Sequence, residues 1–434
     1  MPLELDSRHP GFAARFDALV EAKRAAEADV DEVVGEILAE VEARGDAAVI
    51  EFTERFDRHS LTPETMRVGA DEIAAAARSC PAKILEALEF AASRIIDYHR
   101  RLLPEDDLYE ESDGITLGGR WTPIAAVGLY VPGGTAAYPS SVLMNAVPAR
   151  VAGVPRLVMV VPAPDGRLSP LVLAAASIAR IDEIYRVGGA QAVAALAFGT
   201  ETILPVDKIV GPGSAYVAAA KRQVFGRVGI DMIAGPSEVV IVADGKNDPA
   251  WIAADLLAQA EHDPLAQAVL ITDDDALAGA VLEAVDDHLK VLPRAEIAAA
   301  SWQNHGAVIR LDSLENAPAL IDRLAPEHLE LAVETPEALA DQINNAGAIF
   351  LGRYTPEAVG DYVGGPNHVL PTSRSARFSS GLSVLDFLKR TSLLRCDAQG
   401  LRALGPAAVT LAKAEGLEAH ALSVAIRLNK PDEA

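Results

Sequence analysis

The chain has 434 residues, of which 50% are hydrophobic and 23% are charged, and this balance is typical of a folded globular protein. Its 62 acidic and 38 basic residues give a formal net charge of −24, which repels phosphate backbones and anionic membrane surfaces. The composition therefore disfavours nucleic-acid binding and membrane association.

The N-terminal sequence, Met-Pro-Leu-Glu-Leu-Asp, is acidic where a secretory signal would be basic, and no apolar run approaches the ~20 residues that span a bilayer. The cysteines, Cys80 and Cys396, lie far apart in the sequence, which is usual in a reducing compartment. We therefore expect a cytoplasmic protein.

The N-terminal quarter, residues 30–99, has apolar side chains every three or four positions, which is helical spacing. Beyond Trp121, short runs rich in Val and Ile end at Gly or Pro and precede Ala-rich helical segments. This alternation is typical of βαβ units, which form parallel sheets covered by helices on both faces. The predicted strands are 124–131, 157–161, 183–187, 208–210, 238–242 and 268–271. The predicted helices are 142–151, 170–179, 191–198, 215–224 and 250–262, and the chain turns helical again over 386–426.

The pattern changes near Leu129, Pro236 and Phe378, and these changes indicate the domain boundaries. We expect an N-terminal helical arm over 1–27, a first α/β domain from 28–129 and 238–380, a second α/β domain over 130–237, and a C-terminal helical tail over 381–434.

Four Gly-rich turns follow strand-like runs, at 132–134, 188–191, 211–214 and 234–237. At the carboxyl ends of parallel strands, the next helix offers unpaired N–H groups to a phosphate, so these turns are candidate nucleotide contacts. None of them spells Gly-x-Gly-x-x-Gly. For any one turn, a glycine required by a tight βα connection is the simpler explanation.

Gln259 and His262 are three residues apart on a predicted helix, so their side chains share a face and could bind a metal ion. Taken alone, a His that complements the helix dipole beside a solvated Gln explains them more simply. Asp361 and His368 fall in a Gly- and Pro-rich segment, where function concentrates but where Asp is also a common turn residue. For Glu415 and His420, on a predicted helix, a solvated surface is the alternative.

The pair Glu327-His328 follows Pro326 and lies between Leu324 and Leu329. Titratable groups among apolar neighbours tend to have shifted pKa values, and a His near neutrality is a natural proton acceptor for an alcohol. A helix N-terminus with Pro in its first turn explains the same pattern equally well.

Together these segments resemble histidinol dehydrogenases nearly from end to end, in the order in which that family carries them. The matching segments are Val-Gly-Leu-Tyr-Val-Pro-Gly-Gly from Val127, Val-Gly-Gly-Ala-Gln-Ala from Val187, Gly-Pro-Ser-Glu from Gly235, Gln-Ala-Glu-His from Gln259, Pro-Glu-His-Leu-Glu from Pro326, Gly-Asp-Tyr-Val-Gly-Gly-Pro-Asn-His from Gly360 and Glu-Gly-Leu-Glu-Ala-His from Glu415.

The resemblance implies a role for each of these positions. The implied zinc ligands, one ion per subunit, are Gln259, His262, Asp361 and His420, with His420 reaching the site of a partner subunit. The implied NAD contacts are Tyr130, Gln191 and Ser214. The implied proton acceptors are Glu327 and His328, and Ser237, Glu415, His328 and the metal ligands would hold histidinol. Ser214 stands where the family usually has Asn, which leaves that cofactor contact one hydrogen-bonding atom short.

The resemblance also implies the fold and the reaction. The fold would be an intertwined homodimer of two incomplete Rossmann-like parallel-sheet domains. The first would carry most metal and catalytic residues, and the second, 130–237, would bind the cofactor without the usual Gly-rich loop. The reaction would be the four-electron, NAD-linked oxidation of L-histidinol to L-histidine through bound histidinaldehyde. The alternatives are a related dehydrogenase of another small alcohol, such as a sulfonated one, and a non-catalytic nucleotide-binding protein.

Overall fold

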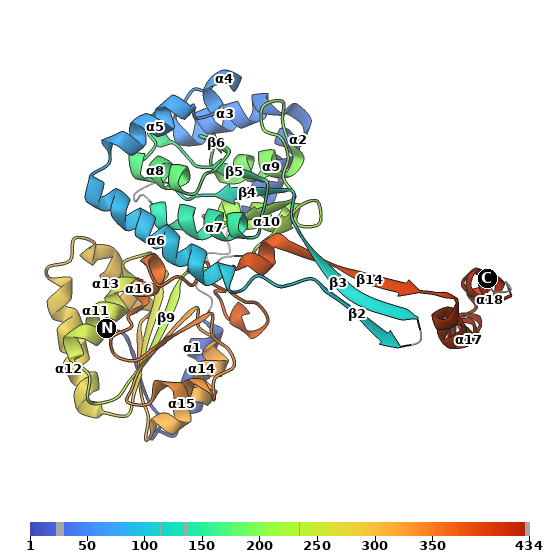
Figure 1. Ribbon diagram of the computed structural model, residues 1–434. Helices are drawn as coiled ribbons and strands as arrows, with labels where there is room; N and C mark the ends of the chain where they lie inside the picture. The colour runs from blue at the N-terminus through green and yellow to red at the C-terminus, as the bar shows by residue number, and fades with distance from the viewer. Residues whose placement is uncertain (23–29, 113, 134–137, 234, 430–434) are drawn as a thin grey trace.

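The computed structural model describes residues 1–22, 30–112, 114–133, 138–233 and 235–429. Figure 1 shows two lobes, each built on one parallel sheet, and a long arm that projects from them. Among the described residues, no helix is long and apolar enough to cross a membrane.

The upper lobe of Figure 1 contains a five-stranded parallel sheet in the order β6-β5-β4-β7-β8. The chain adds β5 and β6 on one side of β4 and then returns to add β7 and β8 on the other side. Such a reversal opens a ligand crevice at the carboxyl ends of the strands. The strands are β4 (Ala126–Tyr130), β5 (Arg156–Val160), β6 (Glu183–Tyr185), β7 (Lys208–Val210) and β8 (Gly229–Ile230). The helices between them are α7 (Pro139–Val151), α8 (Pro170–Ile178), α9 (Gly189–Phe198) and α10 (Ala215–Val224), with the short 3-10 helix η1 (Pro164–Gly166).

Helices from the N-terminal quarter cover both faces of this sheet. α2 packs against α9 and α10 on one face, while α5 packs against α8 and α6 against α7 on the other. The expected grouping of residues 28–129 with 238–380 therefore does not hold for these helices. Periodicity shows which face of a helix is buried, but not against which sheet. The helices are α2 (Val30–Arg44), α3 (Asp46–Asp57), α4 (Pro63–Met66), α5 (Ala70–Ser79) and α6 (Ala82–Arg100).

The lower lobe contains a six-stranded parallel sheet in the order β1-β11-β10-β9-β12-β13, with helices on both faces. Its strands are β1 (Leu3–Asp6), β9 (Glu238–Ala243), β10 (Gln267–Thr272), β11 (Ala307–Arg310), β12 (His328–Ala332) and β13 (Ala348–Leu351). α11 (Pro249–Ala260), α12 (Asp275–Leu289) and α13 (Ala295–His305) cover one face, and α1 (Phe12–Glu21) and α14 (Ala317–Leu324) cover the other. The remaining helices are α15 (Pro336–Ala340), α16 (Glu357–Tyr362) and the 3-10 helices η2 (Leu314–Asn316), η3 (Ser375–Arg377) and η4 (Val384–Phe387).

The N-terminal residues, expected to form a helical arm over 1–27, instead enter this sheet. Residues 3–6 form the edge strand β1, which pairs in parallel with β11, and α1 packs on the same lobe through Phe16. The expected boundary at residue 27 lies outside the described residues. A four-residue strand is too short to give a recognisable pattern, so pairing with β11 decides its structure.

The third sheet forms the arm and corrects the helix expected from residue 386. β14 (Leu388–Cys396) pairs antiparallel with β3 (Ile115–Pro123), which also pairs with β2 (Asp107–Ser112). Helix begins only at α17 (Ala398–Ala414), which packs on α18 (Glu418–Leu428) at the far end of the arm (Figure 1). A partner strand from another part of the chain overrides the local pattern here.

The two lobes are connected by a short segment of chain and by a hydrogen bond between them. Only residues 231–237 separate β8 from β9, so the carboxyl edge of the upper sheet leads directly to the amino edge of the lower sheet. The side-chain amide of Asn367 also donates to the carbonyl oxygen of Met144 in α7, at 2.6 Å. Two of the four Gly-rich turns, 188–191 and 211–214, lie at this carboxyl edge of the upper sheet, at the starts of α9 and α10. Residues 134 and 234 of the other two turns lie outside the described residues.

Candidate active site

Glu327 and His328 lie at the beginning of β12. α14 ends at Leu324, Ala325 adopts a left-handed conformation with φ of 47°, and the strand starts at His328. The alternative of a helix N-terminus at this pair is therefore wrong. Strand alternation turns Leu329 and Leu331 toward α14 and turns His328 toward the face covered by α11. Both residues of the pair are buried, with 5% and 4% of their surface exposed.

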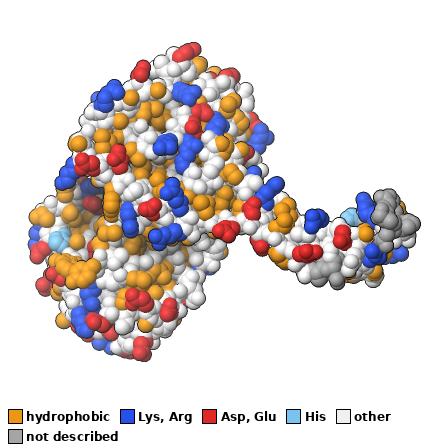
Figure 2. Space-filling view, in the orientation of Figure 1, with side chains coloured by type: hydrophobic (Ala, Val, Ile, Leu, Met, Phe, Trp, Pro, Cys, Tyr) orange, Lys and Arg blue, Asp and Glu red, His pale blue; other side chains and the backbone are white. Residues whose placement is uncertain are grey.

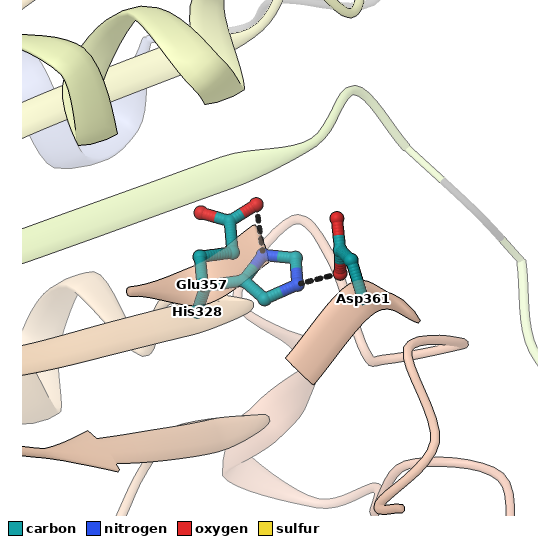
Figure 3. Close-up of side chains that lie close together, drawn as sticks. All are labelled: His328, Glu357 and Asp361. Atoms are coloured by element: carbon teal, nitrogen blue, oxygen red, sulfur yellow. Dashed lines mark ion pairs between the residues drawn. The ribbon is translucent and has the colours of Figure 1, made fainter. Parts of the chain in front are cut away.

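The imidazole of His328 is fixed by its neighbours (Figure 3). Nδ1 lies 3.1 Å from the carbonyl oxygen of Glu238, which can only accept, so Nδ1 carries the hydrogen and Nε2 has the lone pair in the neutral ring. Nδ1 is 3.6 Å from Oε1 of Glu357, and Nε2 is 3.7 Å from Oδ1 of Asp361. Burial opposes the charged ring, but the carboxylates of Glu357, Glu327 and Asp361 outweigh it and raise the pKa of His328 well above its usual value.

The carboxyl group of Glu327 is held from the neighbouring strand. Its Oε2 accepts a hydrogen bond from the backbone N–H of Glu238 at 2.9 Å and lies 3.7 Å from Nδ1 of His328. Complete burial raises the pKa of Glu327 to about 7, although the imidazole of His328 acts in the opposite direction. A carboxyl group with this pKa can hold or release a proton near neutrality, as a general base must.

Glu357 is a member of this cluster that the sequence analysis missed. It lies in the first turn of α16, where a Glu is common because it complements the helix dipole, so no sequence signal marks it. It is nevertheless buried, with 3% exposed, and its pKa is raised well above the usual value, mainly by burial. With its amide nitrogen turned toward this carboxylate, Gln259 donates to Oε1 at 2.5 Å and to Oε2 at 3.2 Å.

These side chains have the chemistry of a cation site. One ligand atom from each of His328, Glu357 and Asp361 lies within 4.8 Å of the others. When ionised, several buried carboxyl groups around one imidazole carry more negative charge than the ring can balance, and a divalent cation would favour their ionised forms. The donor set therefore fits a metal ion.

The structure brings some of the four expected metal ligands together. Gln259 ends α11 beside Glu357, and Asp361 faces His328 from α16. His262 does not lie on the helix as predicted, because α11 ends at Ala260 and Pro264 disfavours helix in the residue before it. His262 is exposed in the turn that follows, with its N–H bonded to the carbonyl oxygen of Gln259 at 3.2 Å.

His420 and Glu415 are not in this cluster within one chain. They belong to the helices at the far end of the arm, away from both sheets in Figure 1, and both are exposed. They do not share one helix as predicted, because α17 ends at Ala414 and Gly416 turns the chain with φ of 72° before α18.

The three expected cofactor residues lie along the carboxyl edge of the upper sheet. Tyr130 ends β4, and its hydroxyl accepts a hydrogen bond from the N–H of Gly189 at 3.0 Å, at the start of α9. Gln191 is 1% exposed in the first turn of α9, and no described residue forms a hydrogen bond with its Oε1. Ser214 precedes α10, and its exposed hydroxyl does not cap the helix. β4 and β7 are neighbours at the reversal of strand order, where open parallel sheets bind ligands; Tyr130 ends β4 and Ser214 follows β7.

Ser237 lies directly before β9, between the two edges. Its carbonyl oxygen accepts from the N–H of Gln267 at 3.0 Å, and nearby the N–H of Gly235 donates to Oγ1 of Thr372 at 2.6 Å. These bonds anchor the connection between the lobes beside Glu238.

A second layer of carboxyl groups supports α16. Glu330 lies two residues after His328 on the same face of β12, and its Oε1 accepts from the N–H of Glu357 at 2.6 Å. Burial, together with the neighbouring Asp255, raises the pKa of Glu330 to about 8, and burial raises that of Asp255 to about 6. A Glu inside the apolar strand His-Leu-Glu-Leu-Ala is the one sequence signal that could have revealed this layer.

The protein has a reversal of strand order in one of two parallel sheets, a buried Glu327–His328 pair and a cluster that could hold a metal ion. These features are those of a metal-dependent α/β enzyme. The chain belongs to the histidinol dehydrogenase family, whose sequence model, described as histidinol dehydrogenase, matches residues 20–428. The resemblance found in the sequence is thereby confirmed.

Close relatives match over the whole chain. A histidinol dehydrogenase of Rhodospirillum rubrum is 63% identical over 431 residues, covering 99% of each chain, and one of Rhizobium meliloti is 63% identical over 433 residues, covering 100% of each. The crystal structure of histidinol dehydrogenase from Elizabethkingia anophelis is 36% identical, covers 98% of each chain and superposes with a TM-score of 0.94. The expected fold class of parallel α/β sheets is confirmed.

Proposed function

We propose that this chain oxidises L-histidinol through bound histidinaldehyde to L-histidine, reducing two NAD molecules in turn. The observation that carries the proposal is the buried Glu327–His328 pair, which lies inside a carboxylate cluster where the two lobes meet. The reaction needs one base for an alcohol proton and another to activate water. The pair supplies two bases in different environments, as such a sequence requires.

The proposed zinc ligands are Gln259, His262 and Asp361, with His420 supplied by a second copy of the chain. One Gln, two His and one Asp offer nitrogen and oxygen donors that suit zinc. When bound, zinc would grip the imidazole and amino nitrogens of the substrate and orient it. The excess negative charge around His328 supports a cation at this place. In this arrangement, Glu357 holds the amide of Gln259 and the ring of His328.

His328 would accept the hydroxyl proton as a hydride leaves for the nicotinamide. The hydrogen bond from Nδ1 to the carbonyl oxygen of Glu238 leaves Nε2 as the accepting atom. The surrounding carboxylates favour the protonated ring, and positive charge beside Asp361 would weaken that preference. The base function of His328 is therefore coupled to occupation of the cation site.

Glu327 would activate the water that attacks the bound aldehyde. In its ionised form it takes a proton from water, and the resulting hydrate loses the second hydride to a second NAD. Its pKa of about 7 supports this role, because a fraction of the carboxyl group is ionised at neutrality. Retention of the aldehyde on the enzyme joins the two oxidations.

Tyr130, Gln191 and Ser214 would contact NAD at the crevice between β4 and β7. The support is a buried Gln191 carbonyl oxygen that no described residue satisfies, together with an exposed Ser214 whose side chain forms no cap bond to α10. An unsatisfied buried acceptor is costly, which favours a ligand donor at this position.

We further propose a homodimer whose arms exchange residues, acting in the cytoplasm. Glu415 lies at the end of α17 and His420 lies in α18, and both helices stand at the far end of the arm in Figure 1. Figure 2 shows this arm as a narrow projection from the lobes. Leu394, Leu411 and Leu422 expose more than half of their surface on this arm, as expected of residues that pack against another subunit. With Ser237 from the body, the exchanged Glu415 and His420 would complete the substrate site.

The stoichiometry of the purified protein tests the proposal. With limiting histidinol, we expect two NADH formed per substrate consumed, and loss of the rate on chelation with recovery on adding zinc. A panel that includes sulfonated diols separates the related dehydrogenases. A preference for another alcohol, or no NADH with any of them, would reject the proposed substrate.

A further inference from the structure

A buried ion pair lies beneath the Gly211–Ser214 turn and has no part in the chemistry described above. Lys221 comes from the last turn of α10, and Asp231 follows β8. Their side chains are 2% and 1% exposed, and Nζ of Lys221 contacts Oδ1 of Asp231. Burial of both charges is costly unless hydrogen bonds satisfy them, so the remaining partners are informative.

Those remaining partners are the two polar backbone groups of Gly211. Oδ2 of Asp231 accepts from the Gly211 N–H at 2.7 Å, and Nζ of Lys221 donates to the Gly211 carbonyl oxygen at 2.9 Å. β7 ends at Val210, so Gly211 is the first residue beyond the strand. Its backbone groups bond to the ion pair instead of to a neighbouring strand.

The conformation of this turn requires such support. Gly211 has φ of 112°, and a Cβ atom there would lie 2.1 Å from the carbonyl oxygen of Tyr130. The turn is therefore pressed against the end of β4, where Tyr130 meets α9 through Gly189. A small displacement of Gly211 would move Ser214 and the start of α10 relative to Tyr130.

We propose that Lys221 and Asp231 are positioning residues for the NAD site, which hold the 211–214 turn beside Tyr130 before the cofactor binds. This inference rests on the proposed cofactor contacts Tyr130, Gln191 and Ser214. Binding is stronger when the site is held in its bound conformation in advance, because less conformational freedom is lost on association. The ion pair acts through the backbone of Gly211.

A matched ion pair in the same sheet serves as the control. Nε of Arg156 lies 2.7 Å from Oε1 of Glu183, and these residues begin β5 and β6 at the amino edge, opposite the crevice. This pair also anchors backbone, through the carbonyl oxygens of Leu204 and Pro205. Removing this pair therefore shows how the loss of an ion pair far from the 211–214 turn affects the upper lobe.

The experiment compares neutral double variants, which leave no unpaired charge in the interior. Lys221→Met/Asp231→Leu removes both bonds to Gly211, whereas Lys221→Met/Asp231→Asn keeps an oxygen that can accept from its N–H. By calorimetry we expect the dissociation constant of NAD to rise about tenfold or more in the first variant and clearly less in the second. The histidinol dissociation constant and the zinc content should stay within about twofold of the parent, as should NAD binding by Arg156→Met/Glu183→Gln.

An NAD dissociation constant within about twofold of the parent in the Leu variant would overturn the proposal, as would equal weakening of NAD and histidinol binding. If that variant fails to fold, hydrogen exchange on the parent decides: the amide of Gly211, which donates to Asp231, should already be protected without NAD, and exchange at the rate of an open loop would overturn the proposal. A parent that binds histidinol but not NAD would instead reject the underlying cofactor assignment.

Discussion

At the residue scale, burial determines the behaviour of Glu327 and His328. The carboxylates of Glu357, Glu327 and Asp361 raise the pKa of His328 well above its usual value, while burial raises the pKa of Glu327 to about 7. These two adjacent residues therefore differ in protonation within one buried cluster. Burial disfavours the charged form of both, but the neighbouring carboxylates favour the charged form of the imidazole. The proposed division of labour, with His328 in the alcohol step and Glu327 in the aldehyde step, uses this difference.

Glu327→Gln should separate the two oxidations. The amide keeps the shape and an acceptor for the N–H of Glu238 but cannot take a proton from water. In single turnovers, we expect oxidation of supplied histidinaldehyde to slow by roughly 10²–10⁴-fold while the alcohol step changes much less. Equal loss in both half-reactions would contradict the assignment of Glu327 as the water-activating base.

Glu327 should also leave a signature in the pH dependence of stability. Its folded pKa of about 7 is above its usual value of 4.5, so between these values the folded state keeps a proton that the unfolded state has lost. This group therefore lowers the free energy of unfolding of the metal-free protein as pH rises from 4.5 to 7, by up to about 1.4 kcal/mol per pH unit. Denaturation of parent and Glu327→Gln across this range should give a difference that shifts in favour of the variant. A constant difference would show that the pKa is not raised.

At the element scale, the position of α16 depends on the lower sheet. This six-residue helix carries both Glu357 and Asp361, and its first N–H is bonded to Glu330 from β12. The strand that presents His328 thereby also fixes the helix that faces it. The neighbouring Asp255 and Glu330 have raised pKa values, which is consistent with a proton shared between them.

Substitutions of Glu330 test this support. With a pKa of about 8, Glu330 is largely neutral at pH 7, so Glu330→Gln should retain zinc and most activity. Glu330→Leu leaves the N–H of Glu357 buried without an acceptor, which should cost about 1–3 kcal/mol and weaken zinc binding. Zinc content and thermal unfolding of the two variants provide the measurement. Equal zinc affinity in both would show that α16 does not depend on this bond.

At the scale of the whole molecule, the proposed site is complete only if the arm of a second copy contributes to it. Glu415 and His420 stand at the end of an arm that carries them away from their own lobes (Figures 1 and 2). A chain built this way can use these side chains only in a second copy. The proposed dimer is therefore part of the site, and dilution to monomers should remove activity.

Mixed dimers test the exchange directly. Glu327→Gln and His420→Ala should each be inactive alone, because each damages both sites of a symmetric dimer. After unfolding and refolding an equal mixture, half of the dimers are mixed and each regains one intact site, so we expect about a quarter of parental activity. If His420 served its own chain, no site in the mixture would be intact. An absence of recovery, with subunit exchange demonstrated by mass spectrometry, would contradict the exchanged arm.

The sequence alone determined the parallel α/β class, most strands and helices of both sheets, and the family, because these depend on local periodicity and on motifs such as Pro326–Leu329. Tertiary structure decided the rest. It turned residues 388–396 into a strand, placed α2 to α6 on the upper sheet and brought Glu357 against His328, because partners distant in sequence supply the pairing and the burial. From the sequence alone, a carboxylate at the start of a helix is expected to be solvated, and only the tertiary structure shows that Glu357 is buried.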